Sequence, residues 1–248
     1  MIDKLKLLRG KPIPCNGLEI IPLTLGQIEE MGELEYNKRL NLLLVDTNKI
    51  INQSSDLKDL SDYDIFLLLI SQNEEIYNLA LSALKLFTGK DFILTRDGLS
   101  YIDGDNLILF SANDFDLMRK ILAYQNFIDE PDTEERKFKP ANKKAEELIR
   151  KRDKFRKEIQ ERNKNDKDGL HLSDIISIVA SYSNNLDLNK IWDYTVYQLY
   201  EEYARLLLWD EYHSIQQLLP HIDTEKTDID LKHWGTKVSP KIFKEDKV

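Results

Sequence analysis

Residues 170–212 read LHLSDIISIVASYSNNLDLNKIWDYTVYQLYEEYARLLLWDEY. This stretch holds two of the three tryptophans and six of the eleven tyrosines of the 248-residue chain. Its apolar residues recur at intervals of three and four, the spacing that places side chains on one face of an α-helix. A short polar run at residues 183–185 separates two such patterns. The stretch therefore predicts an aromatic-rich helical hairpin.

Each half of this hairpin has its own apolar face. The second helix is expected to begin at Asp187, a residue type that favours the N-cap position. On a helical wheel of about 100° per residue, Trp192 and Tyr203 fall in the apolar arc and are predicted to be core. Tyr194 and Tyr197 fall at the polar edge, and exposed aromatic residues are enriched at protein interfaces. Both are candidate partner contacts, unless another segment of the same chain covers them. The apolar face of the first helix is predicted to comprise Leu172, Ile175, Ile176, Val179 and Tyr182.

Composition restricts the class of protein. Hydrophobic residues make up 42% of the chain and the net charge is -9, so we expect a soluble protein with a real core. An acidic chain argues against nucleic acid as the default partner. The single cysteine, Cys15, excludes a disulfide framework within one chain and suits a reducing cytoplasm. No secretory signal and no apolar run of the roughly 18 residues that a membrane helix needs is found.

The N-terminal half, residues 1–126, is predicted to be a helical domain with a small antiparallel β element. Glycines and prolines in residues 1–17 are expected to break any helix there, and residues 18–21 predict a short strand. Gly32 separates a helix that begins at Leu25 from a helical run over residues 33–51, and Gly89 is a natural helix stop. Thr24 is expected to be an N-cap that forms a capping box with Gln27. The other expected N-caps are Ser61 (or Asp62), Asn73 and Ser111.

Residues 91–110 change to the period of β-strands. Turn signals at Asp97-Gly98 and Asp103-Gly104 predict a hairpin or a three-stranded meander from Phe92 to Phe110. Acidic side chains around Gly104 are reminiscent of a calcium loop, but the spacing and terminal glutamate of an EF-hand are missing. We therefore interpret this segment as an ordinary acidic turn.

Residues 127–169 are predicted to be a linker and a charged helical arm. Residues 136–164 carry 13 basic and 5 acidic side chains, a net charge of +8, which leaves -17 on the remainder of the chain. Acidic residues alternate with the basic ones and can form i,i+4 pairs. These features favour a solvated helix or a protein-contact arm, with Arg150 and Arg152 as candidate contacts. Binding of nucleic acid and pairing with the acidic remainder are the alternatives.

The remaining boundaries follow from composition. The aromatic module is assigned to residues 170–220, because its helical pattern continues as far as Pro220. Residues 221–248 are a polar tail with one anchor-like cluster, LKHWG at residues 231–235, which contains Trp234. A tethered tryptophan of this kind docks on its own domain or on a partner.

Motifs of enzyme chemistry are absent from the sequence. It contains no phosphate-binding glycine loop, no GxSxG elbow and no HExxH pair. No two of its four histidines have i,i+4 spacing. We therefore predict a non-enzymatic protein with no catalytic residues, no cofactor and no metal ion.

The segment LSDIISIVASYSNNLDLNKIWDYTVYQLYEEYARL at residues 172–206, followed by HWG at residues 233–235, resembles a segment of proteins from tailed bacteriophages and prophages of Gram-positive hosts. Residues 20–40, IIPLTLGQIEEMGELEYNKRL, are similar to phage tail-region proteins. The resemblance is to tail assembly chaperones. It implies a non-enzymatic factor in the host cytoplasm that covers the long tape-measure protein before the tail tube polymerises.

The sequence is compatible with more than one function. A structural tail or baseplate subunit of the virion is the main alternative to a chaperone, and nucleic-acid binding through the charged arm is a weaker one. The expected partner is the tape-measure protein or another tail protein. Self-association into a homo-oligomer is also open, and no membrane partner is expected.

Overall fold

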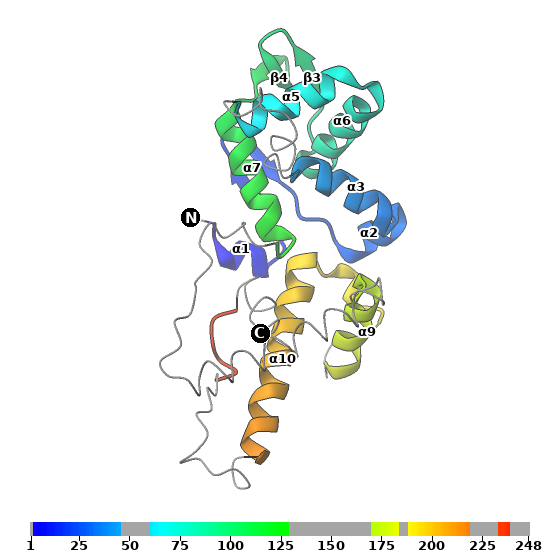
Figure 1. Ribbon diagram of the computed structural model, residues 1–248, viewed down its shortest axis with the longest axis vertical. Coiled ribbons are helices and arrows are strands. Elements are labelled where there is room, and N and C mark those ends of the chain that lie inside the picture. Colours follow the sequence, from blue (N-terminus) through cyan, green and yellow to red (C-terminus); the bar gives the residue numbers. More distant parts are fainter. Residues whose placement is uncertain (1, 46–59, 129–169, 184–187, 219–232, 239–248) are drawn as a thin grey trace, which may run out of the picture. The chain divides into compact units, whose positions relative to one another are not determined.

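The computed structural model describes residues 2–45, 60–128, 170–183, 188–218 and 233–238. These residues form a mainly helical protein, as the sequence predicts, with two small antiparallel sheets, of which the sequence predicted the second (Figure 1). The chain divides into two compact units. The first unit contains residues 1–128 and 192–198, and the second contains residues 129–191 and 199–248.

Helices of the first unit begin and end largely where local signals place them. Thr24 and Ser111 form the predicted N-caps, each with a capping box, and Ser61 caps in the same way. Asn73 caps through its side chain, and Gly89 ends its helix in the left-handed conformation at φ 70°. The helices are α1 Lys4–Leu8, α2 Leu25–Met31, α3 Glu33–Leu43, α5 Asp62–Gln72, α6 Glu74–Thr88 and α7 Ala112–Gln125.

Two helix predictions need correction. A short helix, α1, forms within the segment that was expected to have none, because it ends before Gly10 and is capped by Asp3, whose side chain accepts a hydrogen bond from the Leu5 N–H. The helical run predicted for residues 33–51 ends at Leu43, with Leu44 as its C-cap. Residues 46–51 of that prediction lie outside the described residues.

The first sheet is a two-stranded hairpin of β1 Ile13–Cys15 and β2 Leu18–Ile20. Its turn residues Asn16 and Gly17 both have positive φ, 44° and 94°, as a two-residue hairpin turn requires. The strand predicted over residues 18–21 is confirmed, whereas β1 was not predicted because it contains Pro14. An edge strand tolerates a proline, and β1 pairs on one side within the described part of the chain.

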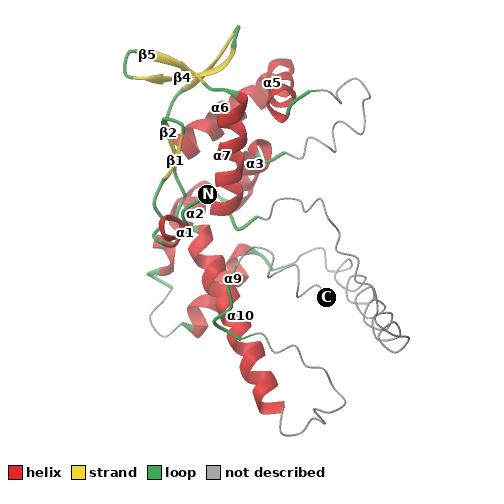
Figure 2. Cartoon of the chain, turned by 90° about the vertical axis from the view of Figure 1, so that its left-hand side faces the viewer, coloured by secondary structure: helices red, strands yellow, loops and turns green. Residues whose placement is uncertain are grey.

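The second sheet is the predicted three-stranded meander, which consists of β3 Phe92–Thr95, β4 Gly98–Asp103 and β5 Asn106–Leu109 (Figure 2). In its register, Phe92 lies opposite Tyr101, and Tyr101 lies opposite Ile108. The acidic turn is held by an ion pair, since Lys90 Nζ lies 2.6 Å from Asp103 Oδ1. This hydrogen bond raises the pKa of Lys90.

The core of the first unit lies where α5, α7 and the meander meet. The Phe66 ring stacks on Phe115 at a centroid distance of 4.8 Å, and Tyr63 lies 5.5 Å from the same ring. All three side chains are buried. The core is thus closed by aromatic residues from helices far apart in the sequence.

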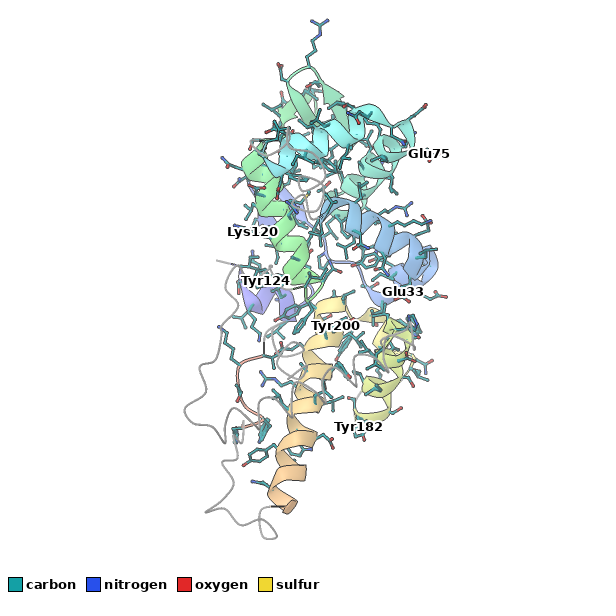
Figure 3. All side chains as sticks on the ribbon, in the orientation of Figure 1. Glu33, Glu75, Lys120, Tyr124, Tyr182 and Tyr200 are labelled. Carbon is teal, nitrogen blue, oxygen red and sulfur yellow. The ribbon has the colours of Figure 1, made fainter. Side chains whose placement is uncertain are left out.

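The aromatic stretch at residues 170–212 differs from the prediction at its centre. Its first helix, α9 Leu172–Tyr182, is present, but Tyr182 at the end of that helix is 70% exposed (Figure 3). The second helix, α10 Val196–Leu218, begins at Val196 rather than at Asp187. A 3-10 turn, η2 Ile191–Asp193, precedes it.

This later helix start changes the environment of Trp192. The helical wheel assumed one continuous α-helix from Asp187. Trp192 lies in a 3-10 turn, so the angle of 100° per residue does not predict the direction of its side chain. Trp192 is 36% exposed and is not a core residue.

Helix α10 starts with a capping box. Gln198 N–H donates to Thr195 Oγ1 at 3.3 Å, and Thr195 N–H donates to Gln198 Oε1 at 2.8 Å. Thr195 also forms an antiparallel bridge with Thr24, which caps α2 with a matching box. Tertiary pairing thus joins two threonine N-caps that are distant in the chain.

Candidate protein-contact site

An exposed aromatic cluster in the second unit is the strongest candidate for a contact site. Trp209 of α10 and Trp234 of the tail pack edge to face at a centroid distance of 5.4 Å. Tyr212 lies 5.1 Å from the His233 ring, and His213 lies 4.1 Å from Trp209. We call these five residues, Trp209, Tyr212, His213, His233 and Trp234, the tryptophan cluster.

Helical spacing places the α10 members of the cluster on one face. Trp209, Tyr212 and His213 are three and four residues apart, so their side chains are neighbours on the helix surface. Arg205 lies one turn earlier on the same face. The cluster is therefore formed by consecutive turns of one helix and by the tail segment that lies against it.

Arg205 holds the tail segment in place. Its Nη1 donates to the carbonyl oxygens of Trp234 at 3.1 Å and of Thr236 at 2.6 Å. Its Nη2 lies 3.5 Å from Glu201 Oε1, and Glu201 is buried. A guanidinium group presents its donors in a rigid fork, so it can hold two carbonyl groups and a carboxylate at once.

The tail segment forms its own tight turn. Thr236 N–H donates to the His233 carbonyl at 2.8 Å, and Gly235 N–H donates to His233 Nδ1 at 3.0 Å. A Cβ atom on Gly235 would lie 3.0 Å from the same nitrogen, so the His233 ring would have to shift by a few tenths of an ångström. The HWG sequence thus has a local structural reason, because the glycine lets the histidine ring accept a backbone hydrogen bond.

Both tryptophans keep much of their surface exposed. Trp209 is 50% exposed and Trp234 is 42% exposed. Tryptophan, tyrosine and arginine are the residue types that most often dominate binding energy at protein interfaces. The cluster presents large apolar rings in a fixed geometry, which suits it to recognise a protein surface.

Of the five residues predicted as contacts, the structure places Trp234 in this cluster. Tyr194 is half-buried in the first unit, where its carbonyl accepts a hydrogen bond from Leu25 N–H at 2.7 Å. Arg150 and Arg152 lie outside the described residues.

The expectation that Tyr197 is exposed is wrong. Tyr197 is 4% exposed, and its ring lies 5.5 Å from Phe127. Another segment of the same chain covers it, the alternative left open by the sequence. Tyr197 is therefore a core residue of the first unit and is not available for a partner.

Sequence reasoning did not identify Arg205 or Trp209 as site residues. The wheel assigned Arg205 to the polar side of the helix, where a long cation needs no special role. The available signal was the spacing Arg205, Trp209, Tyr212 and His213, which places one cation and three aromatic rings on one helix face. This helix face becomes a site only because the tail segment packs against it, and no local sequence pattern predicts where that segment lies.

Part of the chain is similar to a known protein family. A family model described as the YomV second domain matches residues 162–239, a range that contains the whole tryptophan cluster and Arg205. No curated protein matches the chain, and no solved structure matches it. In the described ranges, no helix is long and apolar enough to span a membrane.

Proposed function

We propose that this protein is a non-enzymatic phage tail morphogenesis factor. In this proposal it is a tail assembly chaperone that binds the tape-measure protein in the host cytoplasm through the tryptophan cluster. The observation that carries the proposal is the exposed Trp209–Trp234 pair, held by Arg205. The segment containing this pair is similar to the second domain of YomV, a protein of a Bacillus prophage region.

The chemistry of the cluster fits a helical, partly apolar partner. A long helical protein exposes apolar stripes before assembly, and exposed indole rings can cover such stripes. The two rings leave roughly 200 Å² uncovered, judged from the size of an aromatic side chain. Burial of that area contributes about 5 kcal/mol before the costs of association. The costs of association are about 4–15 kcal/mol, so the two rings act together with further contacts, and the resulting complex can later be released.

Co-expression with the tape-measure protein, followed by affinity capture of the tape-measure protein, tests the proposal. We expect a soluble complex that contains the full chain. Trp209→Ala and Trp234→Ala should each weaken the complex about 30-fold, the effect of losing about 2 kcal/mol at an interface hot spot. Trp192→Ala is the matched control, because Trp192 is also exposed but lies outside the cluster.

Two outcomes would contradict this proposal. One is the absence of any complex with the wild-type chain. The other is equal weakening by all three tryptophan variants, with circular dichroism showing that each is folded. Mass spectrometry of purified phage particles separates the chaperone from a structural subunit of the virion: a chaperone should be nearly absent, whereas stoichiometric copies would support the structural alternative.

A further inference from the structure

Strand β5 is an outer strand of the meander in the described part of the chain (Figure 2). Phe110 N–H donates to the Leu99 carbonyl at 2.8 Å, which identifies residues 99 and 110 as a hydrogen-bonded pair. Because hydrogen-bonded and non-hydrogen-bonded pairs alternate in an antiparallel ladder, Asn106 and Ile108 also direct their backbone groups toward β4. Leu107 and Leu109 must therefore direct theirs away from the sheet.

One face of the meander carries four large apolar side chains that are exposed, whereas Gly98 and Ser100 on the same face are buried. Leu107 lies opposite Ile102, while Leu109 and Ile93 lie on either side of Ser100, so these side chains share a face. The four large residues are 39–55% exposed, with Ile93 at 39%, Ile102 at 46%, Leu107 at 55% and Leu109 at 52%. The strand residues on this face are Ile93, Thr95, Gly98, Ser100, Ile102, Leu107 and Leu109, none of which is charged.

Exposed edge strands of monomeric proteins usually carry a lysine, a proline or a bulge that prevents pairing with another strand. Residues 106–109 of β5, NLIL, contain no such residue, and the register to β4 is regular. All four residues are exposed. The strand thus has the features of an edge that pairs with another chain.

We propose that β5 pairs antiparallel with β5 of a second copy of this chain, with the two-fold axis at Ile108. Leu107 then pairs with the partner's Leu109, and Leu109 pairs with the partner's Leu107. Each of these two pairs exchanges two backbone hydrogen bonds, and two three-stranded sheets become one six-stranded sheet. The strand is its own complement, because its two outward residues are both leucine and lie symmetrically about Ile108.

Charge is compatible with a second copy as the occupant, and the area indicates how strong the dimer is. The pairing places Asn106 opposite the partner's Phe110 and Asp105 opposite the partner's Ser111. No like charges therefore meet along the paired strands, although the chain carries a net charge of -9. The apolar face is of the size of a typical functional patch, about 300–600 Å², which is below the roughly 800 Å² per partner of a standard stable interface. We therefore expect a weak dimer whose population rises with protein concentration.

An engineered cysteine tests the register. Cys15 is fully buried, so a cysteine placed on β5 is the reactive thiol of the variant. In Ile108→Cys the two cysteines form a non-hydrogen-bonded pair with a Cα separation of about 4.5 Å, within the range that a disulfide bridges. Asn106→Cys is the matched control, because its partner copy lies four positions out of register, roughly 13 Å away.

We expect mild oxidation to give a disulfide-linked dimer of Ile108→Cys at least 10-fold faster than of Asn106→Cys. Sedimentation of the unmodified chain should show a dimer that increases with concentration. Leu107→Lys and Leu109→Lys should raise its dissociation constant at least 10-fold, whereas Leu34→Lys, a change at an exposed leucine on α3, should leave it unchanged.

The proposal is overturned if the wild-type chain remains monomeric up to millimolar concentration. It is also overturned if the β5 lysine variants dimerise like the wild type, or if the two cysteine variants cross-link at equal rates. None of these outcomes bears on capture of the tape-measure protein, because the tryptophan cluster contains no residue of the meander.

Discussion

Removal of the Tyr63 hydroxyl should destabilise the junction between α5 and the meander. Tyr63 Oη accepts a hydrogen bond from Leu99 N–H at 3.0 Å and donates one to the Phe110 carbonyl at 2.6 Å. Leu99 and Phe110 form a ladder pair that would normally exchange two direct hydrogen bonds. One direct bond is present, and the hydroxyl takes the place of the other.

The cost of Tyr63→Phe follows from this geometry. Tyr63 is 7% exposed, so water does not readily replace the lost hydroxyl. A buried donor or acceptor left without a partner costs about 1–3 kcal/mol, and two such groups result here. Part of this free-energy cost would be recovered if Leu99 N–H donated a hydrogen bond directly to the Phe110 carbonyl. We therefore expect Tyr63→Phe to lower the free energy of unfolding by about 2–4 kcal/mol.

Urea denaturation followed by circular dichroism measures this loss. Tyr124→Phe is a suitable control, because Tyr124 lies on α7 and is 41% exposed (Figure 3). A change at such a surface position should stay within about 0.5 kcal/mol. If Tyr63→Phe costs no more than the control, the bridging role of the hydroxyl is refuted.

Dependence on pH gives a second readout of the same substitution. Burial raises the pKa of Tyr63 above its ordinary value, so the folded state binds this proton more tightly than the unfolded state does. Its contribution to stability is complete below the ordinary tyrosine pKa of about 10 and is lost as the pH rises through the folded-state pKa. Tyr63→Phe should lack this component of the alkaline loss, and an unchanged alkaline profile would contradict the assignment.

Two further substitutions test the helix N-termini of the first unit. Burial opposes ionisation of Asp114, but hydrogen bonds from Ser111 and Asn16 outweigh it and lower the pKa of this carboxyl group. Asp114→Asn should therefore reduce the free energy of unfolding at pH 7. In urea titrations, the difference from the wild type should shrink as the pH falls from about 4 through the lower folded-state pKa of Asp114. A difference that does not depend on pH would exclude ionisation of Asp114 as its cause. Thr195→Ala should cost about 1 kcal/mol in thermal unfolding through loss of the α10 cap, whereas Thr195→Ser should retain most of the stability, and equal losses would argue against a capping role.

Local chemistry determined most of the helix boundaries and the meander. An N-cap such as Thr24 or Ser111 satisfies backbone groups within three residues of itself, and Gly89 ends α6 by its own backbone freedom. The turn signals at Asp97-Gly98 and Asp103-Gly104 likewise act on their immediate neighbours. Such features could be predicted because their causes lie within a few residues.

Tertiary structure decided what the aromatic residues do. Burial of Tyr197 depends on Phe127, some seventy positions earlier in the chain. The bridge between Thr24 and Thr195 joins segments that are even farther apart in the sequence. The 3-10 turn before α10 also broke the helical phase from which the position of Trp192 was predicted.

The opening stretch, residues 170–212, by itself indicated helices and a concentration of aromatic residues. It did not indicate that residues 233–238 would pack against Arg205 and Trp209. The hydrogen bonds from Arg205 to the carbonyl groups of Trp234 and Thr236 form only when this distant segment lies against α10. Periodicity determines which residues share a face of a helix. What covers that face depends on distant segments, and their approach is set by packing of the whole chain.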